Sequence, residues 1–171
     1  MRIFVAAALT AGCLIIMNAH AQAPTVPPNL PAALKPTGMA PYLQVSATGT
    51  QVYTCGMSNG AWTWVFKAPD AQLFDAQKKQ VGKHYAGPTW EALAGGKVVG
   101  AVKASAPGGA GNIPWLLLDV KSREGSGVFT EAKGILRVDT KGGVAPAQGC
   151  DQAHSGQESR VPYTANYIFL K

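Results

Sequence analysis

Hydrophobic positions in this chain recur in short alternating segments rather than in long helical stripes. After Tyr42, β-branched and aromatic segments are separated by glycine and proline, and no apolar period of 3.6 residues persists for three turns. The pattern therefore predicts an all-β domain, either a β-sandwich or a flattened β-barrel of about eight to eleven short strands.

The expected strands end where turn residues begin. They cover residues 43–47, 51–55, 61–67, 71–75, 81–86, 89–94, 97–105, 113–121, 127–130, 134–140 and 163–170. Between two of them, Gly95-Gly96 predicts a two-residue hairpin turn, because glycine tolerates the positive φ that such turns require. The one segment for which a helix is the alternative to a strand is 70–79.

Alternation within the strands predicts which side chains share a face. Trp62, Trp64 and Phe66 lie on one side of their strand, and such an aromatic stripe is more often sheet core than a ligand platform. The segment 115–120 is apolar on both faces apart from Asp119, which is typical of a strand covered on both sides.

Alternation in the last two expected strands, 134–140 and 163–170, gives each a distinct pair of faces. One face of the final strand carries every second residue from 163 to 169, namely Tyr163, Ala165, Tyr167 and Phe169. Arg137 and Asp139 share the face opposite Leu136, and their spacing predicts an outward ion pair, worth at most about 1 kcal/mol if it is an ordinary surface pair. Both are also candidate ligand-binding residues.

The N-terminus has the pattern of a secretory signal peptide. Met1-Arg2 precedes an apolar run to Met17, and Ala19-His20-Ala21 forms a small-x-small cleavage site. The apolar run is short for a membrane span of about 20 residues. We therefore expect three parts, a signal peptide at 1–21, a proline-rich tether or outer wrap at 22–41 and an all-β domain at 42–171, in a protein that is secreted or periplasmic and has no membrane span after cleavage.

Cleavage changes the cysteine count. It removes Cys13 and leaves Cys55 and Cys150, and an even pair in an oxidising compartment most simply forms one disulfide. By the chain-entropy model, closing so long a loop is worth on the order of 4 kcal/mol. A structural bridge is preferred to a redox or metal role, because the two thiols are far apart in sequence.

The net charge is modestly positive. The whole chain has 15 Lys and Arg against 9 Asp and Glu, and loss of Arg2 leaves 14 against 9, or +5. The basic residues are scattered, with Lys78-Lys79 the one adjacent pair, so nucleic acid is not an expected partner. Weak attraction to an anionic cell-wall or extracellular polymer remains compatible with this charge.

Residues 82–91 concentrate the candidate chemistry. Pairing of the two flanking strands around Gly87-Pro88 would bring His84 near Glu91, and an imidazole–carboxylate pair can act as a general base or acid. Tyr85 and Trp90 instead favour stacking on a ligand. A lone histidine near a turn is more often bonded to a backbone carbonyl, so a structural role for His84 is the simpler interpretation.

Metal and cofactor chemistry finds little support in the sequence. A metal site would need His84 and His154 together with Glu91 or Asp151, and His154 falls in a polar loop, so neither a metal nor another cofactor is expected. The chain also lacks a recognisable nucleophile motif. We therefore expect a binding or structural module of the cell envelope or extracellular space, with a secreted hydrolase or lyase that uses His84 and Glu91 as the alternative.

Five motifs, in this order, resemble one family. They are 47–55, 81–91, 113–118, 135–143 with Cys150, and 161–167. Together they are similar to the secreted bacterial and fungal family catalogued as domain of unknown function 3455. The resemblance implies export and a compact, cysteine-bearing domain, and it implies no particular reaction.

Export and the disulfide are tested together by the intact mass of the native protein. We expect a chain that begins at Gln22 and whose mass rises on reduction, because cleavage removes Cys13 and the remaining cysteines pair. The measurement is mass spectrometry with and without reductant. Two free thiols in the exported protein would contradict the bridge, and an uncleaved N-terminus would contradict the signal peptide.

Overall fold

The chain folds into one closed antiparallel barrel of eight strands in the computed structural model, which describes residues 23–171. The strands are β1 (Pro41–Ser58), β2 (Ala61–Phe74), β3 (Gln80–Tyr85), β4 (Thr89–Ala92), β5 (Lys97–Ala106), β6 (Trp115–Glu124), β7 (Gly134–Gly142) and β8 (Glu158–Leu170), and short 3-10 helices occur at η1 (Ala32–Leu34), η2 (Val128–Glu131) and η3 (Gln152–His154). The predicted signal peptide lies outside the described residues. No helix within 23–171 is long and apolar enough to cross a membrane.

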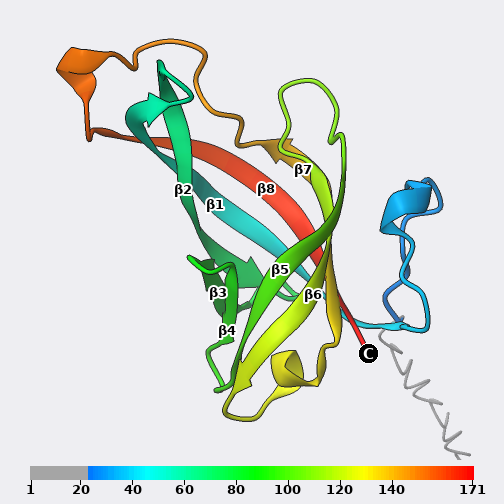
Figure 1. Cartoon of the computed structure of the whole chain (residues 1–171). Helices are drawn as coiled ribbons and strands as arrows, with labels where there is room; N and C mark the ends of the chain where they lie inside the picture. The colour runs from blue at the N-terminus through cyan, green and yellow to red at the C-terminus, as the bar shows by residue number, and fades with distance from the viewer. Residues whose placement is uncertain (1–22) are drawn as a thin grey trace, which may run out of the picture.

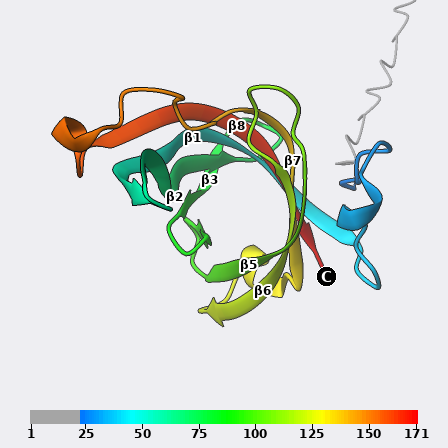
Figure 2. The same cartoon turned by 45° about the horizontal axis from the view of Figure 1, so that its top comes forward.

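The expected all-β fold is confirmed, and the barrel is the architecture found. Each strand pairs with its neighbours in sequence, and β1 also pairs with β8, so the sheet closes on itself (Figures 1 and 2). Because all pairs are antiparallel, the strands alternate up and down. We call the end that carries the β1–β2 hairpin the upper end, as in Figure 1.

Two pairs of expected strands are merged into longer ones. Gly49 interrupts the alternation in sequence, yet it lies inside β1, where an added Cβ would come within 2.2 Å of the Asp70 carbonyl oxygen. This glycine therefore marks a close approach of β1 to β2 rather than a turn. In the same way, segments 61–67 and 71–75 belong almost entirely to the continuous strand β2.

The alternative of a helix at 70–79 is wrong, and the strand predicted at 71–75 is found. Strand β2 continues through Phe74, and the following residues form a turn in which the Asp75 carboxylate accepts hydrogen bonds from the backbone N–H groups of Gln77 and Lys79, both at 2.9 Å. Lys78 has a φ of 64°, which a helix would not allow. The side chain of Asp75 thus replaces helical hydrogen bonds with local ones.

The hairpin at Gly95-Gly96 has the expected positive φ angles, 105° and 82°, but it is longer than expected. Strand β4 ends at Ala92, so the connection to β5 spans residues 93–96. The backbone N–H of Ala92 donates to the Gly96 carbonyl oxygen at 3.0 Å and closes the loop.

Apolar side chains fill the lower half of the barrel. The segment 127–130, expected as a strand, is instead largely the helix η2, and its Phe129 is buried and stacks on Phe169 with ring centroids 4.6 Å apart. Leu73 and Val98 are also fully buried in this interior cluster. Close packing of these side chains closes the barrel at this end.

A second apolar cluster lies outside the barrel, beneath the N-terminal segment. Leu30 and Leu34 pack against outward-facing residues of β5 to β8, namely Ala106, Leu117, Leu136, Val138, Ile168 and Leu170. The N-terminal segment therefore covers one outer face of the sheet (Figure 2). This cover explains why segment 115–120 is apolar on both faces, since Leu118 points inward while Leu117 meets the segment.

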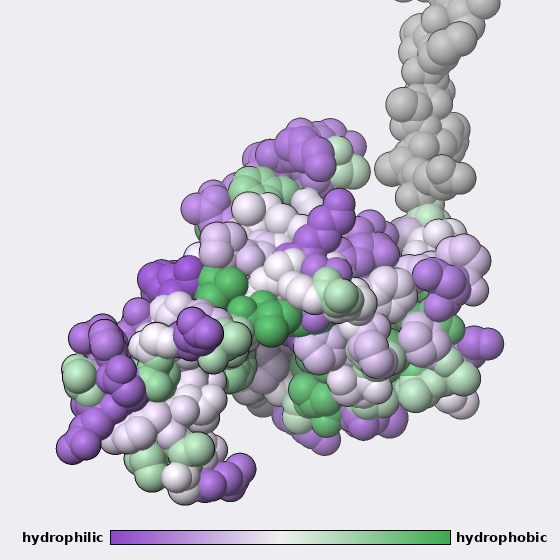
Figure 3. Space-filling view, turned by 90° about the horizontal axis from the view of Figure 1, so that it is seen from above, coloured by the Kyte–Doolittle hydropathy of each residue, from purple (hydrophilic) through white to green (hydrophobic). Residues whose placement is uncertain are grey.

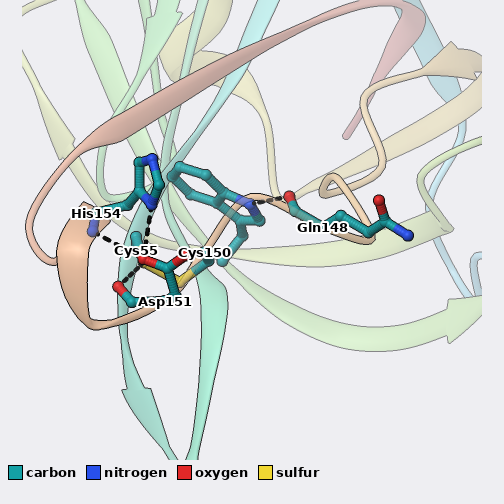
Figure 4. Close-up of a disulfide and its surroundings, with 6 residues drawn as sticks. Cys55, Gln148, Cys150, Asp151 and His154 are labelled. Carbon is teal, nitrogen blue, oxygen red and sulfur yellow. Dashed lines mark hydrogen bonds and ion pairs between the residues drawn. A yellow bond between two sulfur atoms is a disulfide. The ribbon is translucent and has the colours of Figure 1, made fainter.

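The upper part of β1 is tied to the loop after β7 by the predicted disulfide, which is confirmed. Cys55 and Cys150 are bonded, with their Cα atoms 5.3 Å apart (Figure 4). Beside it, Trp64 Nε1 donates to the Gln148 carbonyl oxygen at 2.9 Å, and Asp151 caps η3 by accepting from the His154 backbone N–H. The loop is thus attached to β1 and β2.

The aromatic stripe of β2 is not core, contrary to the expectation. Trp62 and Trp64 are only partly buried and Phe66 is 52 % exposed, because this part of β2 has no second neighbouring strand. Phe66 contacts Tyr53 edge to face, with ring centroids 5.7 Å apart. A stripe on one face becomes core only where a second layer covers it.

The outer cluster is tested by Leu34→Ala, with Leu93→Ala as a matched control. Leu34 is fully buried, so its truncation should lower the free energy of unfolding by about 2–4 kcal/mol. Leu93 is 63 % exposed, so the same change there should cost less than about 0.5 kcal/mol. Urea unfolding measures both. Equal effects would mean that the N-terminal segment does not pack on the barrel in solution.

Candidate functional site

The upper half of the barrel contains a cavity of about 410 Å³. Residues from all eight strands and from two loops line it, namely Gln51, Tyr53, Phe66, Lys67, Pro69, His84, Gly87, Pro88, Trp90, Val102, Ile113, Pro114, Leu116, Leu118, Arg137 and Tyr167. Most of these side chains are apolar or aromatic, and a few polar groups converge among them. That composition is typical of a small-molecule pocket.

The cavity exists because two neighbouring strands are short. β2 pairs with β3 only from Ala71 to Phe74, and β4 pairs with β5 only up to Val99. Above the β3–β4 turn, segments 61–70 and 101–106 therefore face each other without a strand between them. The barrel wall has a gap at this position, in line with the low β3–β4 hairpin in Figure 1.

Apolar side chains border this gap. Phe66 of β2 and Val102 of β5 both line the cavity and are 52 % and 56 % exposed. The space-filling view from above shows hydrophobic surface on both sides of a hollow at this end of the molecule (Figure 3). Exposed apolar residues at the mouth of a cavity are typical of a ligand entrance.

His84 lies inside the barrel and is neutral. It stacks on Trp90 with ring centroids 4.3 Å apart, and its ring centroid is 4.9 Å from that of Tyr167. Its Nδ1–H donates to the Thr89 carbonyl oxygen at 2.8 Å, since a carbonyl can only accept. Burial lowers the pKa of His84 to about 3, so Nε2 keeps a lone pair at neutral pH.

Two buried N–H donors on the cavity wall have no hydrogen-bond partner within the described residues. Trp90 and Gln51 are 1 % and 2 % exposed, and neither Trp90 Nε1 nor Gln51 Nε2 has a partner with hydrogen-bond geometry, although the Gln51 amide lies near the Tyr163 hydroxyl. An unpaired buried donor costs about 1–3 kcal/mol. Such groups call for an acceptor in the cavity, either water or a ligand.

Arg137 supplies the positive charge within the cavity. It is half-buried, and its Nε donates to the Pro114 carbonyl oxygen at 3.0 Å. Burial raises the pKa of Tyr167 and of Tyr53, and the nearby guanidinium acts in the opposite direction on both. No carboxylate lines the cavity, and Arg137 forms no ion pair among residues 23–171.

The structure does not bring His84 and Glu91 together. The strands pair around Gly87-Pro88 as expected, but the register sets His84 opposite Trp90 and Lys83 opposite Glu91. Neighbouring residues of a strand point to opposite faces, so His84 faces the cavity while Glu91 faces outward.

Glu91 and Tyr85 form a contact on the outer face instead. The Tyr85 hydroxyl donates to Glu91 Oε2 at 2.7 Å, and Lys83 Nζ lies 3.3 Å from the same oxygen. The hydrogen bond from Tyr85, and then that from Lys83, lower the pKa of Glu91, so it stays ionised at neutral pH. Of the two residues expected to stack on a ligand, only Trp90 lines the cavity.

The outward ion pair expected between Arg137 and Asp139 is also wrong. Arg137 points into the barrel, while Asp139 is exposed, has a φ of 51° and accepts a hydrogen bond from Asn166 Nδ2 at 3.0 Å. The pairing of β7 with β8 shifts register between Val138 and Lys141, so a bulge breaks the alternation that the sequence implied.

The sequence pattern missed Gln51, Tyr53 and Tyr167 as cavity residues. Alternation in the last strand places Tyr167 on one face with Tyr163. Gln51 is a polar residue at an inward position of an otherwise apolar strand face, and this exception in the pattern is a signal for a cavity residue.

Metal ligands are not gathered anywhere in the described part of the chain. Within residues 23–171, no three His, Cys, Asp or Glu side chains are arranged to hold a metal ion. His154 instead contacts Asp151 in the exposed loop, with Nδ1 and Oδ1 2.6 Å apart.

These features define a class of protein, an eight-stranded antiparallel barrel with a filled lower end and a lined cavity above it. By sequence, the chain belongs to the family described as protein of unknown function (DUF3455), whose model matches residues 36–171. The family membership expected from the five motifs is thus confirmed. No curated protein and no solved structure matches the chain.

The neutral state of His84 predicts an acid-sensitive fold. The unfolded chain binds a proton at this imidazole below about pH 6.5, whereas the folded protein does so only near pH 3, so stability falls as the pH drops through this range. Between pH 7 and 5 we expect a loss of about 2 kcal/mol that His84→Gln abolishes. Urea unfolding at both pH values measures it. His154→Gln is the control and should retain the loss, and an unchanged slope in His84→Gln would contradict the assignment.

Proposed function

We propose that this chain is an exported binding module that holds one small, largely apolar molecule in the upper half of its barrel. An eight-stranded barrel is just wide enough either to be filled by side chains or to hold one small ligand. Here the lower half is filled, and the upper half is the cavity of about 410 Å³. That volume is within the range of about 300–1,000 Å³ found for small-molecule sites.

The observation that carries the proposal is the pair of unpartnered buried donors, Trp90 Nε1 and Gln51 Nε2, in a cavity that is otherwise mostly apolar. A protein that needed this space only for packing would gain stability by filling it with apolar side chains. Buried donors that remain unpaired are instead well suited to fix the orientation of a ligand.

The entrance supports the same function. The gap between β2 and β5 is bordered by Phe66 and Val102, so an apolar molecule meets apolar side chains before it enters. A long polymer is a less suitable ligand, because the filled lower half of the barrel leaves no passage through it. Cell-wall polymers would therefore contact the module by an end group or by its outer surface.

Export is supported by the signal-like N-terminus and by the disulfide, which persists in oxidising compartments. An enzyme that joins His84 and Glu91 in one site is less well supported, because their side chains lie on opposite faces of the sheet. Among the candidate ligand-binding residues, Trp90 and Arg137 line the cavity, whereas Tyr85 and Asp139 belong to the outer surface.

Binding is tested with the neutral fluorescent probe N-phenyl-1-naphthylamine. We expect saturable fluorescence enhancement by the wild-type protein, and we expect Val102→Trp to weaken binding by at least about tenfold, since an indole at this position blocks the gap. Val128→Trp is the matched control. The exposed fraction of Val128, 54 %, is similar to the 56 % of Val102, but Val128 lies at the lower end of the barrel, away from the gap. Fluorescence titration measures all three, and equal affinities or no saturable binding would contradict the proposed function.

A further inference from the structure

The polar groups of the cavity favour one ligand charge over the others. Trp90 Nε1 and Gln51 Nε2 are donors in need of acceptors, and Arg137 adds a cation that no carboxylate of residues 23–171 neutralises. We propose that the ligand is an organic acid, with an apolar body and a carboxylate that meets Arg137. This inference rests on the proposed function, because it assigns the chemistry of the molecule that the cavity holds.

The guanidinium is positioned for such a contact. Its Nε–H donates to the Pro114 carbonyl oxygen, which fixes the side chain near the middle of β7. The guanidinium also lies near the Tyr167 hydroxyl. Its terminal nitrogens carry the remaining N–H groups of a planar fork that matches the two oxygens of a carboxylate. In a cavity with apolar walls, such a charge-assisted pair is stronger than it would be in water.

The other cavity groups agree with an anionic head group. His84 is neutral and adds no competing charge. Lys67 at the rim is already paired with Glu158 of β8. A cationic ligand would be repelled by Arg137, and a purely apolar ligand would take water away from a half-buried guanidinium without replacing its hydrogen bonds.

The apolar body of the ligand has an equally clear place. Phe66, Val102, Ile113, Leu116 and Leu118 supply hydrophobic wall from β2, β5, β6 and the loop before β6. With the carboxylate at Arg137, the body would contact these side chains and the Trp90 ring. The net positive charge, +5 once Arg2 is removed, would also raise the local concentration of an acidic ligand.

The test compares matched acid and amide pairs, such as 1-naphthaleneacetic acid with 1-naphthaleneacetamide and decanoic acid with decanamide. Each displaces N-phenyl-1-naphthylamine from the whole exported protein at pH 7. We expect at least one acid to bind about tenfold or more tightly than its amide, because the carboxylate pairs with Arg137.

Variants assign the preference to Arg137. Arg137→Gln should weaken binding of the preferred acid by about 10- to 100-fold and change binding of its amide by less than about twofold. Arg137→Lys keeps the charge but not the planar fork and should give an intermediate loss, so it serves if Arg137→Gln fails to fold. The control is Arg160→Gln, which removes a surface arginine paired with Asp70 and should change neither affinity.

The outcomes separate the two proposals. If the neutral probe and the amides bind as tightly as the acids, or if acid preference survives in Arg137→Gln, the acid inference is overturned while the binding function stands. If no probe binds with saturation, the proposed function itself fails. Thermal unfolding and near-ultraviolet circular dichroism of each variant confirm that a changed affinity does not arise from lost structure.

Discussion

The pairing of β1 with β8 is the interaction on which the rest of the structure depends. It joins the first strand to the last over a ladder from Pro41 opposite Leu170 to Thr54 opposite Glu158. The backbone N–H groups of Ala40 and Lys171 each donate to the carbonyl oxygen of the other residue, which extends the pairing beyond the start of β1 and the end of β8. Closure removes the two sheet edges that would otherwise be exposed, and it gives every strand an inner and an outer face.

Closure divides the alternating side chains of each strand into an inner and an outer set. In β8, Tyr163 and Tyr167 face the interior, while Ile168 and Leu170 face outward beneath the N-terminal segment. The same strand therefore contributes to the cavity wall and to the outer apolar cluster. This explains why β8 is apolar on both sides at its lower end, where it is covered from within by Phe129 and from outside by Leu34.

Unequal strand length divides the interior into two regions. Below the β3–β4 turn, all eight strands are present and apolar side chains such as Leu73 and Phe169 fill the space. Above it the wall is incomplete and the cavity begins, and the polar interior residues Gln51, His84 and Arg137 border this cavity. Polar groups are tolerated inside the barrel where a cavity gives them access to an acceptor or to solvent.

Much of this architecture was predictable from the sequence. The all-β class, most strand positions, the Cys55–Cys150 bridge and the shared face of Tyr163 to Phe169 all follow from alternation, turn residues and cysteine count, which are local properties of the chain. The family was predictable from five ordered motifs. The region 82–91, which the sequence shows to be rich in polar and aromatic groups, contributes His84 and Trp90 to the cavity.

The tertiary structure decided which of these residues meet. Register places His84 against Trp90 and sends Glu91 to the outside, a bulge separates Asp139 from Arg137, and the short β3–β4 hairpin leaves Phe66 at an entrance instead of in a core. One-residue shifts of register turn a side chain to the other face of a sheet, and they depend on pairing between distant segments. The sequence by itself therefore determined a disulfide-linked β domain with a chemically rich segment, and only closure of the barrel decided that Gln51, Trp90 and Arg137 surround one cavity.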